Sequence, residues 1–164
     1  MTRRLLPAVA LVAVLGALAG AALWWQAATD PAVQVAQTRD LVLDAGSRAL
    51  VDLNTIASDD ADAAVDRWAG SATGPLLEQL QRQREQNVAA ARAARTSATA
   101  RLLQAAVTEL DPAAGTGRVI AALEVRVTTA DGQVATKRSR LAAALARTPA
   151  GWKLSEVEVV GLST

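Results

Sequence analysis

The residues that come closest to a reactive arrangement in this 164-residue chain are three aspartates, Asp59, Asp60 and Asp62. Such a cluster could hold a hard cation, because carboxylate oxygens are the ligands that calcium and magnesium prefer. A calcium-binding loop also needs a glycine at a fixed later position, and none follows there. Acidic side chains are favoured in the first turn of a helix, so helix stabilisation is the simpler interpretation.

Other reactive sites are excluded by residue type. The turn 111–117 is rich in glycine but lacks the lysine and the following helix of a phosphate-binding loop. The chain has no histidine, cysteine or tyrosine, which removes catalytic triads, thiolate nucleophiles, disulfides and iron–sulfur clusters. An acidic general base in a pocket stays possible, without its usual oxyanion-stabilising partners. We therefore expect no enzyme: no catalytic residue, no cofactor and no metal.

The elements that would position a site begin with an apolar segment, residues 5–25. No charged residue occurs from residue 5 to residue 29. In helical form this segment would be roughly 31 Å long, which is close to the hydrocarbon thickness of a bilayer. Arg3 and Arg4 precede it, so residues 1–4 should stay in the cytoplasm and the remainder should lie outside the plasma membrane. Trp24 and Trp25 would then be interface anchors at the far headgroup level.

Two alternatives accompany this membrane helix. A cleaved signal peptide would use Ala17-Leu18-Ala19 as its cleavage site, but its apolar region is usually only ~7–15 residues long, so we favour the uncleaved anchor. Gly16 and Gly20 form a G-x-x-x-G pair that could pack against another transmembrane helix. In a span this rich in alanine, the same spacing also arises by chance.

The charge of the exported part is nearly balanced but unevenly distributed. Without Arg3 and Arg4, 15 basic residues remain against 16 acidic ones, which gives no basic footprint for nucleic acid. Residues 30–66 carry eight aspartates and two arginines, whereas residues 82–101 carry five arginines and one glutamate. This asymmetry indicates either a polarised docking surface or two helical faces that compensate each other, and we favour the second.

Helices are predicted for the first half of the exported part. Residues 26–57 should form a juxtamembrane helix, and a short second helix should run from Ser58 to Gly70, with Trp68 packing it onto the core. A third helix should start at Thr73-Gly74-Pro75. Residues 96–110 fit either a strand or more helix.

An antiparallel meander is predicted for the second half. Residues 117–128 alternate with period two, and Asp131-Gly132 is a hairpin signal before a partner strand at 133–147. A second turn leads to a closing strand at 152–160, where we expect Trp152 to lie in the structural core against the third helix. Helices followed by an antiparallel meander define the class α+β.

Four short motifs give the chain a resemblance to a known family. They are Asp66-Arg67-Trp68, Ala72-Thr73-Gly74-Pro75-Leu76, Ala105-Ala106-Val107 and Gly151-Trp152-Lys153-Leu154. In this order, after one membrane helix, they resemble the actinobacterial Mce-associated (mammalian-cell-entry-associated) membrane proteins. The resemblance implies a nuclear-transport-factor-2-like domain, with about three helices packed on a curved antiparallel sheet of about four strands. It also favours a third helix that ends near Ala98 and a strand at 99–110.

The resemblance implies a function as well. The chain would be a non-catalytic, single-pass scaffold that stabilises an Mce-type importer of sterols or fatty acids, with Mce lipid-transfer subunits and permease proteins as partners. Two alternatives are a lipid-binding module with an apolar conical pocket and an assembly component of a type IV secretion or conjugation-like machine. The expected divisions are a tail at 1–4, a membrane helix at 5–25, a juxtamembrane helix at 26–57 and the remaining α+β domain at 58–164.

Overall fold

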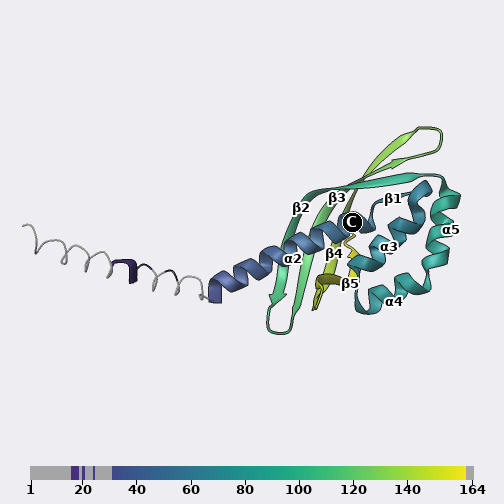
Figure 1. Cartoon of the computed structure of the whole chain (residues 1–164). Coiled ribbons are helices and arrows are strands. Elements are labelled where there is room, and N and C mark those ends of the chain that lie inside the picture. Colours follow the sequence, from purple (N-terminus) through teal and green to yellow (C-terminus); the bar gives the residue numbers. More distant parts are fainter. Residues whose placement is uncertain (1–15, 19, 21–23, 25–30, 162–164) are drawn as a thin grey trace, which may run out of the picture. The chain divides into compact units, whose positions relative to one another are not determined.

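The computed structural model describes residues 16–18, 20, 24 and 31–161 (Figure 1). The chain forms two compact units, residues 1–38 and 39–164, each considered separately. In the first unit Gly16, Gly20 and Trp24 are helical, and Trp24 is 72% exposed. Among the described residues, no helix combines the length and the apolar character that crossing a membrane requires. Trp25 and most of segment 5–25 lie outside the described residues, so the membrane anchor stays a prediction.

The helices are α2 (Pro31–Leu53), α3 (Ala61–Ser71), α4 (Gly74–Arg82) and α5 (Arg84–Ala94), with a 3-10 turn at Ser58–Asp60. The single third helix expected from the sequence is therefore wrong: it is two helices that meet at Gln83. The break lets Val88 of α5 pack against Ala61 and Val65 of α3, while Leu76 of α4 reaches the core under the sheet.

The strands are β1 (Ile56–Ala57), β2 (Ser97–Asp111), β3 (Thr116–Thr128), β4 (Val134–Thr148) and β5 (Gly151–Val159). They form one antiparallel sheet in the order β1-β2-β3-β4-β5, which confirms the class α+β and the predicted meander. The strand expected at 99–110 is present and slightly longer. The expected number of strands was one too low, because β1 is too short to leave a period-two pattern. The β2–β3 register shifts twice, between Leu102 and Gln104 and between Val107 and Glu109.

The main core lies between α2 and one face of the sheet. Val42, Ala49 and Leu50 of α2 pack against strand side chains that are at most 8% exposed. The buried strand members are Ala100, Val119, Ala121, Leu123, Val125, Leu141, Ala143, Leu145 and Leu154. Gly46 lets α2 approach closely, because a Cβ there would lie 3.2 Å from Cγ2 of Val119. Large side chains therefore occupy the space in which a conical lipid pocket was considered.

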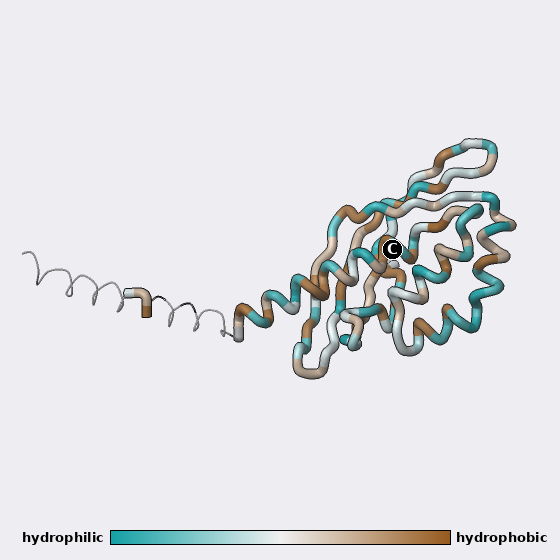
Figure 2. Tube along the Cα trace, viewed as in Figure 1, coloured by the Kyte–Doolittle hydropathy of each residue, from teal (hydrophilic) through white to brown (hydrophobic). Residues whose placement is uncertain are grey.

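A second, smaller cluster joins α3 to α5 through Ala61, Val65 and Val88. Trp68 packs against this cluster, and its indole Nε1 donates a 2.8 Å hydrogen bond to the carbonyl oxygen of Asp52 near the end of α2. Figure 2 shows hydrophilic residues along much of α4 and α5. The polar residues Glu78, Gln79, Gln81 and Arg82 of α4 and Glu85 and Gln86 of α5 are exposed.

Candidate interaction surface on the open face of the sheet

The face of the sheet opposite α2, which we call the open face, presents side chains of alternate residues on β2 to β5. Its centre consists of two neighbouring rows of the ladder. One row is Ala106, Ile120 and Ala142, and the other is Gln104, Ala122 and Arg140. Ile120 is 44% exposed although it is a large aliphatic residue in mid-sheet. The open face therefore has an apolar centre built mainly from small side chains.

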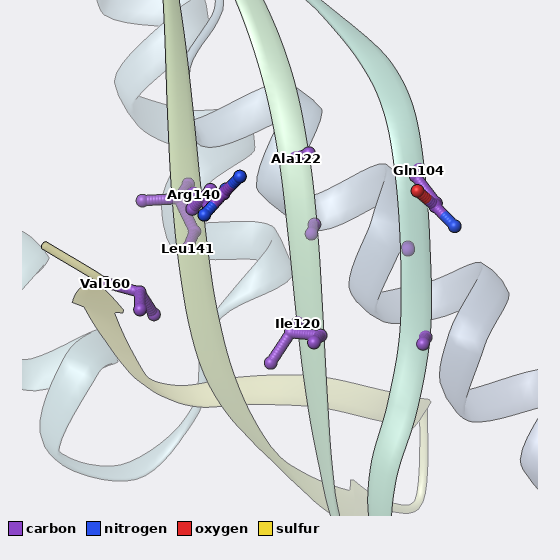
Figure 3. A pocket seen from close by; sticks show the side chains of 9 residues that line it. Gln104, Ile120, Ala122, Arg140, Leu141 and Val160 are labelled. Atoms are coloured by element: carbon purple, nitrogen blue, oxygen red, sulfur yellow. The ribbon is translucent and has the colours of Figure 1, made fainter. Parts of the chain in front are cut away.

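A shallow hollow of about 280 Å³ lies at this centre. Figure 3 shows Gln104, Ile120, Ala122 and Arg140 around it, on three neighbouring strands. Val160 closes one side, where its backbone N–H donates a 2.9 Å hydrogen bond to the carbonyl oxygen of Arg140. The hollow exists because Ala106 and Ala122 have small side chains. The guanidinium of Arg140 and the side-chain amide of Gln104 are the polar groups at its rim. Among the residues that line this hollow, Arg140 carries the only charged side chain.

Charges on the open face are segregated along the strands. In the half of the open face nearer the β3–β4 turn, four arginines stand against one glutamate, Glu124; they are Arg101, Arg126, Arg138 and Arg140. Nη2 of Arg101 lies 3.1 Å from Oε1 of Glu124. Toward the opposite end the two rows from Glu109 to Glu156 and from Ala106 to Glu158 carry three glutamates against Arg118. Within the described residues, Arg126, Arg138 and Arg140 form no ion pair. One half of the face is therefore basic and the other acidic.

The charge asymmetry seen in the sequence has a different origin. In Arg84 of α5, Nη2 lies 3.0 Å from Oδ1 of Asp66 and Nη1 lies 3.5 Å from Oδ1 of Asp62, both on α3. Arg92 of α5 also pairs with Asp62. The hydrogen bond to Asp66 raises the pKa of the Arg84 guanidinium, so this group stays charged. Aspartates of α3 and arginines of α5 thus neutralise each other. This agrees with the favoured prediction that the two charged segments form helical faces that compensate each other.

Two of the aspartates that were considered as a cation site also form ion pairs with arginines. Asp60 pairs with Arg67 at 3.1 Å, and Asp62 pairs with two arginines. In the part of the chain that the structure describes, no three acidic side chains converge in a group that could hold a metal ion.

Of the tryptophans predicted for the structural core, Trp68 and Trp152 are both half-buried. Trp152 packs against the main core and lines a groove of about 470 Å³ between α2 and the start of β5. Leu41, 60% exposed, lines the same groove. Among the sequence-predicted membrane residues, Gly16 and Gly20 have open space where a Cβ would lie, so their packing role stays a prediction.

Sequence reasoning missed the open face. The alternation at 117–128 was interpreted as one apolar face, although its second register also places Ile120 and Ala122 side by side. The sequence did contain a signal for this face. On the side of β3 that carries Arg118, Glu124 and Arg126, the two positions between them are the apolar residues Ile120 and Ala122, which a fully solvated face does not require.

Solved structures show the fold of this chain. The periplasmic domain of DotI superposes with a TM-score of 0.60 at 17% identity, over 74% of this chain and 94% of that one. CagV, a VirB8 homologue of the type IV secretion system of Helicobacter pylori, gives 0.57 at 14% identity, over 76% and 99%. VirB8 of Agrobacterium tumefaciens gives 0.54 at 12% identity, over 78% and 96%. The domain therefore has the nuclear-transport-factor-2-like fold of VirB8-like periplasmic domains.

No protein-family profile and no curated protein sequence matches the chain. The resemblance to Mce-associated proteins is wrong, because the matching structures are VirB8-like domains of secretion systems, and nothing supports lipid transport, Mce partners or an actinobacterial origin. The motifs that suggested it serve the fold itself. Thr73, for example, donates its backbone N–H to the carbonyl oxygen of Leu154 at 2.7 Å and leads into α4. Such residues do not discriminate between families that share this architecture.

Proposed function

We propose that the chain is a non-catalytic, membrane-anchored assembly component of a type IV secretion or conjugation-like machine. The observation that carries the proposal is the match to DotI, CagV and VirB8, each of which is covered over more than nine-tenths of its length. The match therefore spans almost the whole of each of those three domains, and we place the working parts of this chain on the surfaces of that shared fold.

Two independent features support a location outside the plasma membrane. The DotI structure is a periplasmic domain, and in this chain the same fold is preceded by the apolar segment 5–25 with Arg3 and Arg4 before it. The domain would thus stand on the outer side of the plasma membrane, tethered by one helix.

The packing of the domain supports contact with other proteins over chemistry or ligand transport. The space between α2 and the sheet is filled by fully buried side chains such as Leu50, Leu123 and Leu145. The open face instead offers an apolar centre with charged ends, which is the anatomy of a protein–protein interface. We infer that the protein acts by holding other subunits in place.

Cross-linking in native membranes tests this function. The full-length chain, tagged at its C-terminus and expressed from its own locus, is cross-linked, solubilised and purified, and the attached proteins are identified by mass spectrometry. We expect subunits of a type IV secretion or conjugation apparatus, together with loss of substrate transfer when the gene is deleted. Exclusive recovery of subunits from an unrelated transporter, with transfer unaffected by the deletion, would show that the proposal is wrong.

A further inference from the structure

We propose that the basic half of the open face binds an acidic segment of another protein, in which one large apolar side chain is followed by carboxylates at every second position. The inference rests on the proposed function in one respect, namely that the domain works by contact with other proteins. Three features of the described residues carry it: a continuous groove, a row-by-row arrangement of unpaired arginines, and an acidic half that limits what can lie beside them.

The hollow at the centre of the open face continues into a larger one. The second hollow has a volume of about 610 Å³, and four residues line both: Gln104, Ala122, Arg140 and Val160. Ile120 and Val160 are large aliphatic residues that stay exposed along this groove. A concave apolar surface with a few polar groups at its rim is typical of a binding site. The groove therefore has room for one large apolar side chain beside Ala122.

Three unpaired arginines lie next to this groove. Arg140, Arg138 and Arg126 occupy successive rows of the open face, and each is exposed and without an ion pair within the described residues. Glu124 does not neutralise them, because its carboxylate already pairs with Arg101. Successive rows on one face of a sheet are roughly 6.6–6.8 Å apart, and an extended peptide repeats its side chains at the same interval. Carboxylates at every second position would therefore each lie near one guanidinium, the group best suited to bind them.

The acidic half of the same face selects against other anionic partners. Its two rows carry Glu109, Glu156 and Glu158 against Arg118. An anionic bilayer or a nucleic acid presents negative charge over its whole surface, so these glutamates would repel it while the arginines attract it. A polypeptide segment can place its carboxylates over the basic half alone. The apolar hollow between the two halves would then fix the register of such a segment.

Peptide binding to the purified full-length chain, held in nanodiscs of neutral lipid, tests the site. The probe is a labelled synthetic peptide in which leucine is followed by glutamate at every second position. The control peptide has glutamine in place of each glutamate. Fluorescence anisotropy should show that the probe binds, that its binding weakens as salt is raised, and that the control binds about tenfold more weakly. Equal binding of the two peptides, or binding of neither, would overturn the proposal.

Substitutions in the chain test the two contributions separately. Arg138→Gln combined with Arg140→Gln should weaken probe binding by about tenfold, whereas Arg39→Gln, at an exposed arginine of α2, should leave it unchanged. Ala122→Leu fills the hollow, so it should also weaken binding by about tenfold and leave the salt dependence as it was. An unchanged affinity in the double arginine variant, or an equal loss in Arg39→Gln, would refute the assignment.

Two further measurements identify the partner. Phosphatidylglycerol vesicles that bind the nanodisc-held chain through Arg138 and Arg140, with no binding of the peptide, would make this a lipid site and the proposal wrong. In native membranes, a photo-cross-linking residue at position 104 should attach to an acidic segment of another protein, and attachment to a second copy of this chain alone would contradict the proposal. Peptide binding with no secretion subunit among the cross-linked proteins would refute the proposed function and leave this site standing. Secretion subunits without peptide binding would do the reverse.

Discussion

Gly46 on α2 provides a sharp test of how helix and sheet are packed. Replacement by alanine would normally stabilise a helix, since glycine costs about 1 kcal/mol relative to alanine in a helix interior. Here the new Cβ would lie 3.2 Å from Cγ2 of Val119 and 3.4 Å from both terminal methyl carbons of Leu145. Val119 and Leu145 are 0% and 1% exposed, so neither can move toward solvent. Overpacking of this kind costs about 1–3 kcal/mol.

Gly70→Ala is the matched control, because Gly70 is also helical but has nothing within 4 Å of an added Cβ. Both variants gain helix propensity, with the smaller gain at Gly70 in the last turn of α3, so a lower stability of Gly46→Ala reports the packing cost. We expect Gly46→Ala to be less stable than Gly70→Ala by about 1–3 kcal/mol in free energy of unfolding. Each 1 kcal/mol corresponds to about 3–5 °C in Tm for a domain of this size.

Denaturant unfolding of the full-length chain, followed by tryptophan fluorescence, measures these differences. The double variant Gly46→Ala with Val119→Ala removes the methyl group that is closest to the new Cβ. It should therefore show favourable coupling of about 1 kcal/mol relative to the two single changes. If Gly46→Ala stabilises the chain as much as Gly70→Ala does, α2 does not lie this close to β3 and β4, and the packing described above is wrong.

Three further predictions concern single side chains. Trp68→Phe keeps most of the buried ring but leaves the carbonyl of Asp52 without its indole donor, so unfolding should become easier by about 1–2 kcal/mol in denaturant titrations. Trp152→Ala should cost about 2 kcal/mol, roughly half the value for a fully buried tryptophan, and an unchanged Tm would contradict its contact with the core. The Thr129 hydroxyl holds the pKa of Asp131 below its usual range, so the stabilisation of the β3–β4 turn exists above the unfolded pKa of about 3.9 and is lost as the pH falls through the folded value. Thr129→Val should raise the pKa of Asp131 in a carboxyl NMR titration, and an unshifted midpoint would rule this hydrogen bond out.

Local patterns predicted the strands well, because each carries its own signal. The alternation around Val119 to Val127 and the Asp131-Gly132 turn depend on neighbours in the sequence, and β3 and β4 pair as an antiparallel hairpin. For the aspartates near residue 60 the sequence predicted stabilisation of their own helix. In the structure Asp60 pairs with Arg67 of α3 and Asp62 pairs with two arginines of α5, and only the tertiary structure shows these partners.

The break at Gln83 could not be predicted from local sequence. Gln, Arg, Glu and Ala on both sides favour a continuous helix, and no glycine or proline marks the end of α4. The reason lies in Arg84, which pairs with two aspartates of α3, and in Val88, which packs against α3. The open face could not be predicted for a related reason. Each strand has two sets of alternating side chains, and the packing of the helices decides which set is buried.

The two register shifts in β2 bear on how this domain avoids uncontrolled aggregation. Beyond the short pairing with β1, β2 forms a long outer edge of the sheet, and an unprotected edge invites other strands to add to it. The irregularities next to Leu103 and Thr108 interrupt that edge twice, so a straight incoming strand cannot align its hydrogen-bonding groups along it. At high protein concentration, this edge would therefore resist open-ended sheet growth even though most of it has no partner strand in the described chain.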